Sequence, residues 1–317
     1  MPTPTHFLTI AQTPADRIRA MLERAVRLRG RPEPTLLSRK TLLCLFEKPS
    51  LRTRVSFEQA MRKLGGDVMS MHGAEVGIGG RESPEDVARV LSSMVDAIMA
   101  RVLDHATLET FAKVSSVPII NGLSDYAHPA QALADALTLV DEFSPGHVAG
   151  VRGRTVAFVG DGNNVARSLC AVCCKLGMNF VLCAPEGYQI DAQWLAAVRA
   201  EASGGGVGGA GGVSVEQVSD PDKAVAHADA VYCDTFISMG QEHERAQRLS
   251  VFGGYRIDAA LMAQAPRHAI VLHCLPASRG VEITDEVLDG PRSRVFAQAR
   301  NRLDAQTGLL AELLGGG

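Results

Sequence analysis

The sequence predicts an α/β fold with two doubly wound parallel sheets. Short apolar strands alternate with helical patterns over most of the 317 residues, which is typical of parallel sheets. The alternation forms two series, and residues 143–154, with Ser144-Pro145-Gly146 and Gly150, lie between them as a natural boundary. We expect one domain over residues 1–145 and another over 146–292, because a chain of this length with 46% hydrophobic residues can bury two cores.

The first series opens with a helix over about residues 15–29. The run Thr13-Pro14-Ala15-Asp16 offers a cap, a first-turn proline and an acidic residue there. Ser83-Pro84-Glu85-Asp86 marks a second helix start of the same chemistry. Strands are expected near residues 41–46, 67–71, 96–101 and 117–121, with helices between them.

The second series has strands near residues 155–159, 180–183, 230–233 and 269–273. Residues 203–212 contain seven glycines in ten, which predicts a mobile surface insertion. A phosphate-binding role for that run is disfavoured, because no strand ends cleanly before it. Apolar residues recurring between about 293 and 314 predict a closing amphipathic helix.

Composition narrows the class of protein. A formal net charge of -3 gives no basic stripe for a nucleic acid. The seven cysteines show no paired spacing suited to zinc, and most lie in apolar runs, which is typical of a reducing compartment. No signal-like N-terminus or run of 18 apolar residues is present, so we expect a cytoplasmic protein with no membrane partner.

The run Ser50-Leu51-Arg52-Thr53-Arg54 follows a predicted strand and opens a predicted helix. A helix N-terminus exposes free N–H groups and attracts an anion, to which hydroxyls and a guanidinium add charge-assisted hydrogen bonds. Arginines two apart on a helix do not share a face. We therefore assign Arg52 to a phosphate and Arg54 to a supporting ion pair, although a capped helix with surface arginines fits the same spacing.

His128-Pro129-Ala130-Gln131 begins the next helix. With Gln131 one turn later, His128 can donate to a carbonyl oxygen, although an isolated histidine before a helix is often a cap or a packed ring. Arg101 ends a predicted strand, where ligands gather in parallel sheets. Arg302 in the closing helix adds one more guanidinium without an obvious structural need.

Gly160-Asp161-Gly162-Asn163-Asn164-Val165 follows a strand but departs from the dinucleotide-binding spacing. Position 165 is Val, and Leu182-Cys183-Ala184 stands where an acidic residue is expected. A nicotinamide dehydrogenase is therefore disfavoured. Asparagines at a helix N-terminus can equally hold a small zwitterion.

Two further strand ends carry polar groups. Asp234 begins Asp234-Thr235-Phe236-Ile237-Ser238-Met239-Gly240, where a carboxylate can bind an ammonium group or serve as a turn residue. His273-Cys274-Leu275-Pro276 ends the last strand, and its thiol and imidazole leave open acyl-enzyme chemistry or a structural cysteine.

The chain resembles the aspartate/ornithine carbamoyltransferase family in four motifs that occur in the family's order: SxRTR, HPxQ, DxxxSMG and HCLP. The last three residues of DxxxSMG resemble the branch of the family that uses ornithine. The resemblance runs from about residue 35 to Leu314. It implies carbamoyl transfer from carbamoyl phosphate to the side-chain amine of L-ornithine, giving L-citrulline and phosphate in arginine biosynthesis. It also implies two α/β domains with the closing helix returning to the first, no cofactor or metal, and a homotrimer or multiple of trimers.

The resemblance implies roles for particular residues. The phosphate would bind Ser50, the Leu51 backbone, Arg52 and Thr53. The carbamoyl end would bind Arg101, His128, Gln131 and Arg302. Ornithine would bind Asn164, Asp234, Ser238 and Met239, with Cys274 and Leu275 beside its amine and the carbamoyl group. Catalysis is expected from Arg101, His128, Cys274 and Arg302, and the loop 73–82 is expected to complete an adjacent subunit's phosphate site.

Several positions depart from the family pattern. Leu51 replaces a common Thr, Gly77 a common Gln, Phe236 a Trp and Ser278 a His. Rival functions remain: a carbamoyltransferase for acylated ornithine or putrescine, or a catalytically silent regulatory relative.

Overall fold

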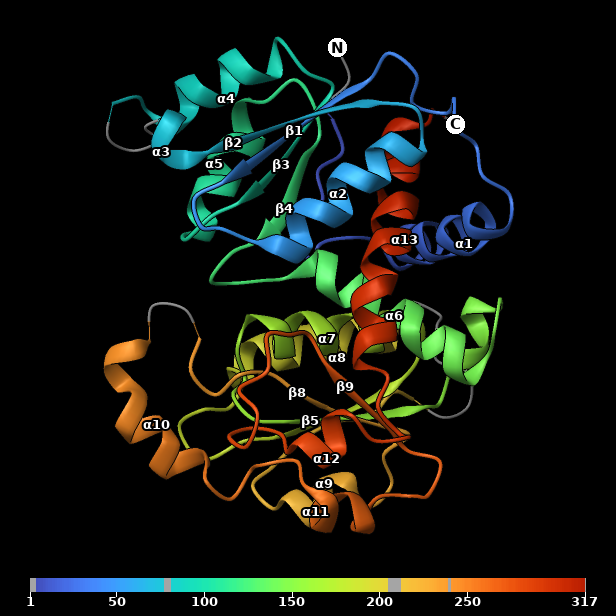
Figure 1. Ribbon diagram of the computed structural model, residues 1–317, viewed down its shortest axis with the longest axis vertical. Coiled ribbons are helices and arrows are strands. Elements are labelled where there is room, and N and C mark those ends of the chain that lie inside the picture. Colours follow the sequence, from blue (N-terminus) through green and yellow to red (C-terminus); the bar gives the residue numbers. More distant parts are fainter. Residues whose placement is uncertain (1–3, 77–80, 205–211, 239–240, 317) are drawn as a thin grey trace. The chain divides into compact units, whose positions relative to one another are not determined.

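The computed structural model describes residues 4–76, 81–204, 212–238 and 241–316. The chain forms two compact units: unit 1 runs to Leu137 and resumes at Arg300, and unit 2 covers Thr138–Ala299. Each unit has one parallel sheet with helices on its two faces, which confirms the predicted α/β class (Figure 1). The last helix, α13 (Val295–Leu314), begins in unit 2 and ends in unit 1, so the expected return of the C-terminal helix is confirmed.

The chain passes between the units inside two helices. One passage lies between Leu137 and Thr138 in α6 (Pro129–Phe143), and the other lies between Ala299 and Arg300 in α13. Turn-forming residues mark residues 143–154 in the sequence, where the structure has the 3-10 helix η1 (Val148–Val151). The domain limits 1–145 and 146–292 stay a prediction.

Unit 1 contains a four-stranded sheet in the order β2-β1-β3-β4. Its strands are β1 (Thr41–Phe46), β2 (Asp67–His72), β3 (Ala97–Arg101) and β4 (Ile119–Leu123). Its helices before α6 are α1 (Ala15–Gly30), α2 (Leu51–Lys63), α3 (Gly73–Val76), α4 (Pro84–Ser92) and α5 (His105–Val114). Val87, Leu108 and Phe111 from α4 and α5 pack on the strands, whereas α2 contacts β1 and β2.

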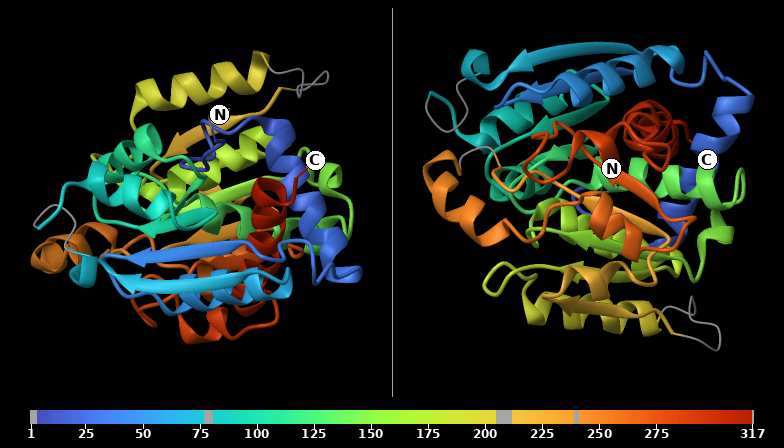
Figure 2. Two further views of the ribbon diagram at one scale, coloured as in Figure 1. Left: turned by 90° about the horizontal axis from the view of Figure 1, so that it is seen from above. Right: turned by 60° about the horizontal axis from the view of Figure 1, so that its bottom comes forward.

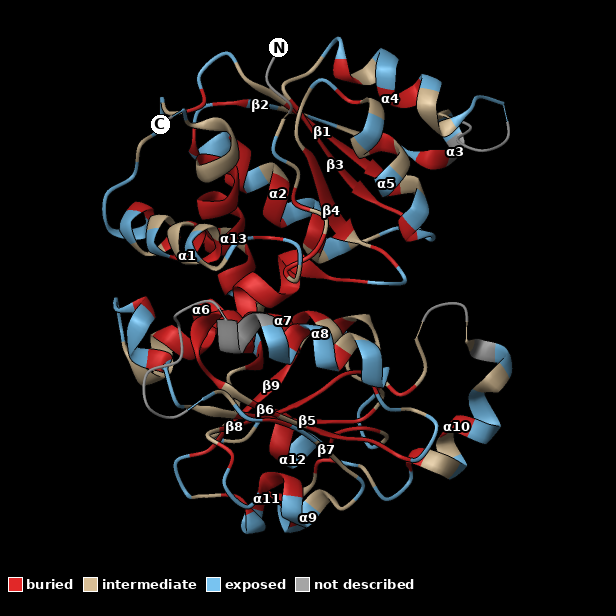
Figure 3. Cartoon of the chain, turned by 180° about the vertical axis from the view of Figure 1, so that it is seen from behind, coloured by how far each residue is buried: buried red, intermediate tan, exposed pale blue. Residues whose placement is uncertain are grey.

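Unit 2 contains a five-stranded sheet in the order β7-β6-β5-β8-β9 (Figure 2). Its strands are β5 (Thr155–Val159), β6 (Asn179–Cys183), β7 (Val215–Val218), β8 (Ala230–Cys233) and β9 (Ile270–His273). Its helices are α7 (Asn164–Leu176), α8 (Ala192–Gly204), α9 (Pro221–Val225), η2 (Glu242–Glu244), α10 (Arg245–Phe252), α11 (Ala259–Gln264) and α12 (Asp285–Leu288). Val225, Leu261 and Leu288 from α9, α11 and α12 pack on β5, β8 and β9. Strands β8 and β9 are buried throughout (Figure 3).

Each sheet has its own carboxylate clamp, an aspartate that binds backbone and side-chain donors at the amino ends of two neighbouring strands. In unit 1, Asp96 accepts the N–H of Thr41 at 2.8 Å and the ammonium of Lys40 at 3.0 Å. In unit 2, Asp229 accepts the N–H of Thr155 at 2.8 Å, and Arg154 donates to it at 2.8 Å. Each clamp ties the first residue of the central strand to the residue that precedes the neighbouring strand.

Three sequence expectations need correction. Thr13 does not cap α1: Pro14 is the N-cap, and the Thr13 hydroxyl donates to the Thr9 carbonyl at 2.8 Å. β4 begins two residues later than predicted, because Pro118 cannot donate an N–H to a ladder. The short strand β7 was not predicted, since Val215–Val218 offers only four residues of weak apolar pattern. Most of the glycine-rich run, residues 205–211, lies outside the described residues.

We expect Asp229→Asn to lower the free energy of unfolding by about 1–3 kcal/mol at pH 7, because the Thr155 N–H, Arg154 and His268 lose a charged partner. Burial, the largest single influence, raises the pKa of Asp229, but hydrogen bonds from Thr155 and Arg154 outweigh it and hold that pKa below its usual value. The carboxylate's contribution is therefore complete above about pH 4 and is lost as the pH falls through the folded-state pKa. Urea unfolding should show a difference from wild type that shrinks in acid. Asp222→Asn, at an exposed helix start, is the control. A loss independent of pH would contradict the clamp's charge-based role.

Candidate functional site

In unit 1 an anion-binding helix start follows β1, as the sequence predicts. Ser50 is the N-cap of α2, yet its side chain makes no capping hydrogen bond, so the hydroxyl is not consumed by the helix. Leu51 is exposed and begins the helix, where the first-turn N–H groups have no intrahelical acceptor. This arrangement can bind an anion through backbone donors and one hydroxyl.

The two arginines of this turn have different surroundings. Arg54 pairs with Glu58 one turn later, with 2.9 Å between Nε and Oε1, as expected of a supporting residue. Arg52 is half-buried, and in the described part of the chain its backbone carbonyl accepts the Ser56 hydroxyl at 2.6 Å, whereas its guanidinium makes no side-chain hydrogen bond or ion pair. Its guanidinium is thus the one available to a ligand at this helix end.

Thr53 joins α2 to two buried guanidinium groups. Its hydroxyl oxygen accepts from Arg302 at 2.9 Å and from Arg101 at 3.4 Å. Arg302 also donates to the side-chain carbonyl of Gln131, whose amide in turn donates to Asp135 at 2.8 Å. All of these side chains are buried. The structure therefore brings together four residues that sequence reasoning selected from α2, β3, α6 and α13.

His128 lies next to this cationic network. Burial lowers its pKa well below the usual value, and the nearby charges of Arg302 and Arg101 lower it further. Its imidazole is therefore neutral at physiological pH and carries a single ring N–H. A neutral imidazole can donate to a carbonyl oxygen without adding a charge to a site already rich in cations.

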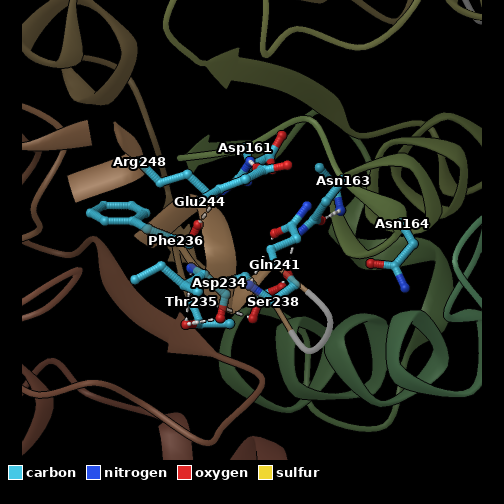
Figure 4. Close-up of polar contacts among 12 residues, drawn as sticks. Asp161, Asn163, Asn164, Asp234, Thr235, Phe236, Ser238, Gln241, Glu244 and Arg248 are labelled. Atoms are coloured by element: carbon cyan, nitrogen blue, oxygen red, sulfur yellow. Dashed lines mark hydrogen bonds and ion pairs between the residues drawn. The ribbon is translucent and has the colours of Figure 1, made fainter. Parts of the chain in front are cut away.

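Unit 2 has a polar cluster of its own, which centres on Asp234 (Figure 4). One carboxylate oxygen accepts the Thr235 N–H at 2.8 Å and the Cys274 thiol at 3.0 Å. The other oxygen accepts from the side-chain amide of Asn163 at 2.9 Å. A carboxylate held in this way is fixed in direction and can bind an ammonium group.

The thiol of Cys274 is a donor to Asp234, and the neighbouring imidazole is engaged elsewhere. Nδ1 of His273 accepts the Leu275 N–H at 2.9 Å, and Nε2 lies 3.3 Å from Glu282. The other six cysteines are buried, and burial raises the pKa of Cys183 to about 12. Cys274 is therefore the accessible thiol, and its geometry is that of a hydrogen-bond donor rather than of a nucleophile activated by an imidazole.

Asn163 is a site residue that sequence reasoning did not assign. Its side-chain oxygen caps α7 by accepting the N–H groups of Val165 and Ala166, while its amide nitrogen donates to Asp234. The predicted ligand Asn164 lies apart from the Asp234 cluster in Figure 4 and accepts the Val165 N–H at 3.0 Å. The two adjacent asparagines could not be told apart from the sequence, because either fits an N-cap.

Arg248 on α10 anchors the segment that follows β8. It donates to the Phe236 carbonyl at 2.6 Å, forms an ion pair with Asp161, and lies 5.1 Å from the centre of the Tyr188 ring. Burial raises the pKa of Asp161 despite the adjacent guanidinium. No sequence motif pointed to Arg248, since its partners lie far away along the chain.

Ser238 is held by Gln241, whose side-chain oxygen accepts the Ser238 N–H at 3.1 Å. Met239 and Gly240, the rest of the predicted SMG motif, lie outside the described residues. The same is true of Gly77 in the loop 73–82. Cys274 and Leu275 belong to unit 2, whereas the other residues predicted to bind carbamoyl phosphate belong to unit 1.

Among the described residues, no group of three or more His, Cys, Asp or Glu side chains has an arrangement that could hold a metal ion. Within the same residues, no helix is both long enough and apolar enough to cross a membrane.

Unit 1 carries a helix start that can bind an anion, and unit 2 carries a fixed carboxylate that can bind an ammonium group, which suits an enzyme that acts on small charged molecules. Residues 5–141 match the family domain described as "Aspartate/ornithine carbamoyltransferase, carbamoyl-P binding domain", and residues 152–313 match its Asp/Orn binding domain. The chain belongs to the aspartate/ornithine carbamoyltransferase family and is a transferase.

Individual relatives agree with this assignment. An ornithine carbamoyltransferase of Methanopyrus kandleri is 45% identical, covering 98% of this chain and 97% of its own length. The solved ornithine carbamoyltransferase of Pyrococcus furiosus has a TM-score of 0.91 at 42% identity, covering 99% of this chain and 98% of that one. The anabolic enzyme of Campylobacter jejuni has a TM-score of 0.89 at 35% identity, with 98% of both chains covered.

We expect Arg52→Ala to weaken the binding of inorganic phosphate about 10- to 100-fold, because one hydrogen bond to a charged group is worth about 1.5–3 kcal/mol. Arg54→Ala, two positions along the same helix, should change it less than about twofold, since its partner is Glu58. Titration calorimetry of both variants with phosphate checks the division. Equal losses in the two variants would contradict it.

Proposed function

We propose that the chain transfers the carbamoyl group of carbamoyl phosphate to the side-chain amine of L-ornithine, giving L-citrulline and phosphate. The observation that carries this proposal is the buried network in unit 1, where Thr53 binds the guanidinium groups of Arg101 and Arg302 beside neutral His128. When an acyl phosphate loses its phosphate group, negative charge develops on the oxygens in the transition state, and a network of guanidinium groups stabilises that charge. The printed names of the relatives, ornithine carbamoyltransferases, support the same acceptor.

In unit 1 the substrate phosphate is held by the start of α2. Ser50, Arg52 and Thr53 bind its oxygens through hydroxyls, a guanidinium and backbone N–H groups, and the Leu51 N–H adds a further donor. Arg101, His128, Gln131 and Arg302 hold the carbamoyl end. Each well-aligned donor of this kind contributes about 3 kcal/mol to the stabilisation of the transition state.

In unit 2 the amino-acid end of ornithine binds to Asp234 and Ser238, with Asn164 and Met239 completing the set by resemblance to the family. Cys274 and Leu275 lie beside the reactive amine and the carbamoyl group. The side-chain amine of ornithine titrates near 10.4, as lysine does, so only about one molecule in a few thousand is neutral at pH 7. A site that lowers this value by about three units contributes roughly 4 kcal/mol.

The chemistry follows from these groups without a cofactor. The neutral amine attacks the carbamoyl carbon, the bond from that carbon to the phosphate oxygen breaks, and the departing phosphate accepts the amine proton. Carbamoyl phosphate is already activated, so the protein supplies position and electrostatic stabilisation.

We further propose a homotrimer or multiple of trimers that acts in arginine biosynthesis in the cytoplasm. Unit 1 supports self-association, because Leu51 and Val55 on α2 and Met69 on β2 are exposed. β2 is the edge strand of its sheet, and its side chains are only partly covered. An exposed edge strand with apolar side chains favours contact with another chain. In such an assembly the loop 73–82 would complete the phosphate site of a neighbour.

An acceptor panel tests the reaction. With carbamoyl phosphate, we expect the ureido product to form fastest with L-ornithine and far more slowly with acetylornithine, putrescine and aspartate. The reason is that Asp234 provides a carboxylate for a free α-ammonium group. Colorimetric assay of ureido products at equal enzyme concentration decides the matter. Absence of citrulline at high enzyme concentration would refute the proposal. A preference for putrescine would show that the acceptor is putrescine rather than L-ornithine.

Cys274→Ser tests the role of the thiol. The serine hydroxyl can still donate to Asp234, but it loses the apolar, polarisable contact with the amine. We expect kcat/KM for ornithine to fall about tenfold, equivalent to about 1.4 kcal/mol, with little change in KM for carbamoyl phosphate. Mass spectrometry of wild-type enzyme quenched during turnover should show no added mass on Cys274. A trapped carbamoyl-cysteine would refute the non-covalent mechanism.

A further inference from the structure

A short turn with a buried base precedes His128 in unit 1. The turn, Ser124–Ala127, follows β4 and closes on itself, since the Ser124 N–H donates to the Ala127 carbonyl at 3.0 Å and the Ala127 N–H donates to the Ser124 hydroxyl oxygen at 3.2 Å. Asn121 adds side-chain hydrogen bonds to Ser124 and Ala127 at 3.2 and 3.3 Å. Ser124 and Asn121 are completely buried and Ala127 is buried, whereas Asp125 and Tyr126 at the tip of the turn are exposed, so the polar contacts at the base of the turn lie in the interior of the unit.

His105, the first residue of α5, fastens this turn from a neighbouring element. Its backbone N–H donates to Asp125 at 2.9 Å, and its ring nitrogen Nδ1 lies 2.8 Å from the Ser124 hydroxyl. Its ring also lies 5.0 Å from that of Tyr126, at an angle of 41°. Three successive residues of the turn therefore contact one histidine.

The donors around Ser124 favour one direction for its hydrogen bond with the His105 ring. The hydroxyl oxygen accepts from Asn121 and from the Ala127 N–H, which occupies its two lone pairs. Its own proton is then directed to the closest acceptor, Nδ1 of His105, because the alternative acceptor, the Ala127 carbonyl, is 3.4 Å away. These distances favour the arrangement in which Nδ1 of His105 accepts a hydrogen bond from the Ser124 hydroxyl.

The far side of the turn is continuous with the carbamoyl-binding residues. The His128 carbonyl accepts the N–H groups of Gln131 and Ala132 at 3.1 and 3.2 Å and so starts α6. His128 is fixed on one side by a helix and on the other by Ala127. A displaced turn would rotate the imidazole of His128, and a misplacement of about 1 Å can cost a reaction about 100-fold.

We propose that His105 is a positioning residue for carbamoyl transfer: it accepts a hydrogen bond from the Ser124 hydroxyl and so holds the turn that orients His128 toward the carbamoyl group. The inference rests on the proposed function, because it assigns a purpose to the orientation of His128. His105 and Ser124 are not among the residues that we expect to contact a substrate.

The experiment is a double-mutant cycle with a matched rescue. His105→Leu removes the acceptor, whereas His105→Asn retains one, because the asparagine side-chain oxygen occupies roughly the position of Nδ1. We expect His105→Leu to lower kcat/KM for carbamoyl phosphate about 10- to 100-fold and His105→Asn to recover most of that loss. In a His128→Ala background, measured at high enzyme concentration, the effect of His105→Leu should fall below about twofold.

Two further measurements separate positioning from general damage. His105→Leu should weaken the binding of carbamoyl phosphate but not of inorganic phosphate, which contacts only the start of α2. His6→Leu removes another hydrogen bond to a ring nitrogen, from the Ile119 N–H at 3.1 Å, and should leave kcat/KM within about twofold of wild type.

The inference is overturned if His105→Leu retains wild-type kcat/KM, if its loss persists in the His128→Ala background, or if phosphate binding weakens equally. It is also overturned if His105→Asn is as impaired as His105→Leu. A wild-type enzyme that makes no citrulline would instead count against the proposed function, and the two binding measurements would still test His105.

Discussion

Two guanidinium groups share one hydroxyl oxygen in the interior of unit 1, and the arrangement of the surrounding elements follows from that constraint. Arg101 and Arg302 repel each other, and burial makes that repulsion stronger than it would be in water. Thr53 is a neutral acceptor for both cations, and Gln131 is a second neutral acceptor for Arg302. Asp135 in turn accepts a hydrogen bond from the Gln131 amide. Burial lowers the pKa of His128 well below its usual value, and the same two charges lower it further. A site of this kind has an excess of positive charge before its ligand arrives, which suits a doubly charged phosphate compound.

Parallel strands explain why residues so distant in the sequence come together. Arg101 ends β3, Asp234 follows β8, and Cys274 follows β9, so each lies at the carboxyl end of its sheet. The helix starts of α2 and α7 face the same ends and contribute Thr53 and Asn163. Each sheet therefore collects its polar groups at one edge, where helix N-termini add backbone donors.

Much of this organisation could be predicted from the sequence, because the decisive signals are local. Strand β5 has the predicted limits, and β1 does as well. Ser50–Arg54 and His128–Gln131 were identified because a strand end followed by a helix start is visible as a pattern. The division between Arg52 and Arg54 followed from helical spacing alone, and the ion pair of Arg54 with Glu58 agrees with it.

The remainder depended on tertiary contacts that a single sequence does not encode in any local pattern. Arg248 reaches Asp161 across 87 residues, and His105 reaches Ser124 across 19. Asn163 and Asn164 are chemically identical, so only the direction of each side chain decides which one binds Asp234. Thr13 is not the cap of α1 because the helix begins at Ala15, which makes Pro14 the N-cap.

The carboxylate clamps at Asp96 and Asp229 have an evolutionary consequence. They secure each sheet at the amino ends of its strands, whereas the polar groups proposed for chemistry gather at the opposite ends. Within each unit, the contacts that stabilise the sheet therefore lie at the amino ends of the strands, and the groups proposed for chemistry lie at the carboxyl ends. A lineage can exchange residues at the reactive edge, and so acquire a new acceptor, while inheriting an unchanged frame.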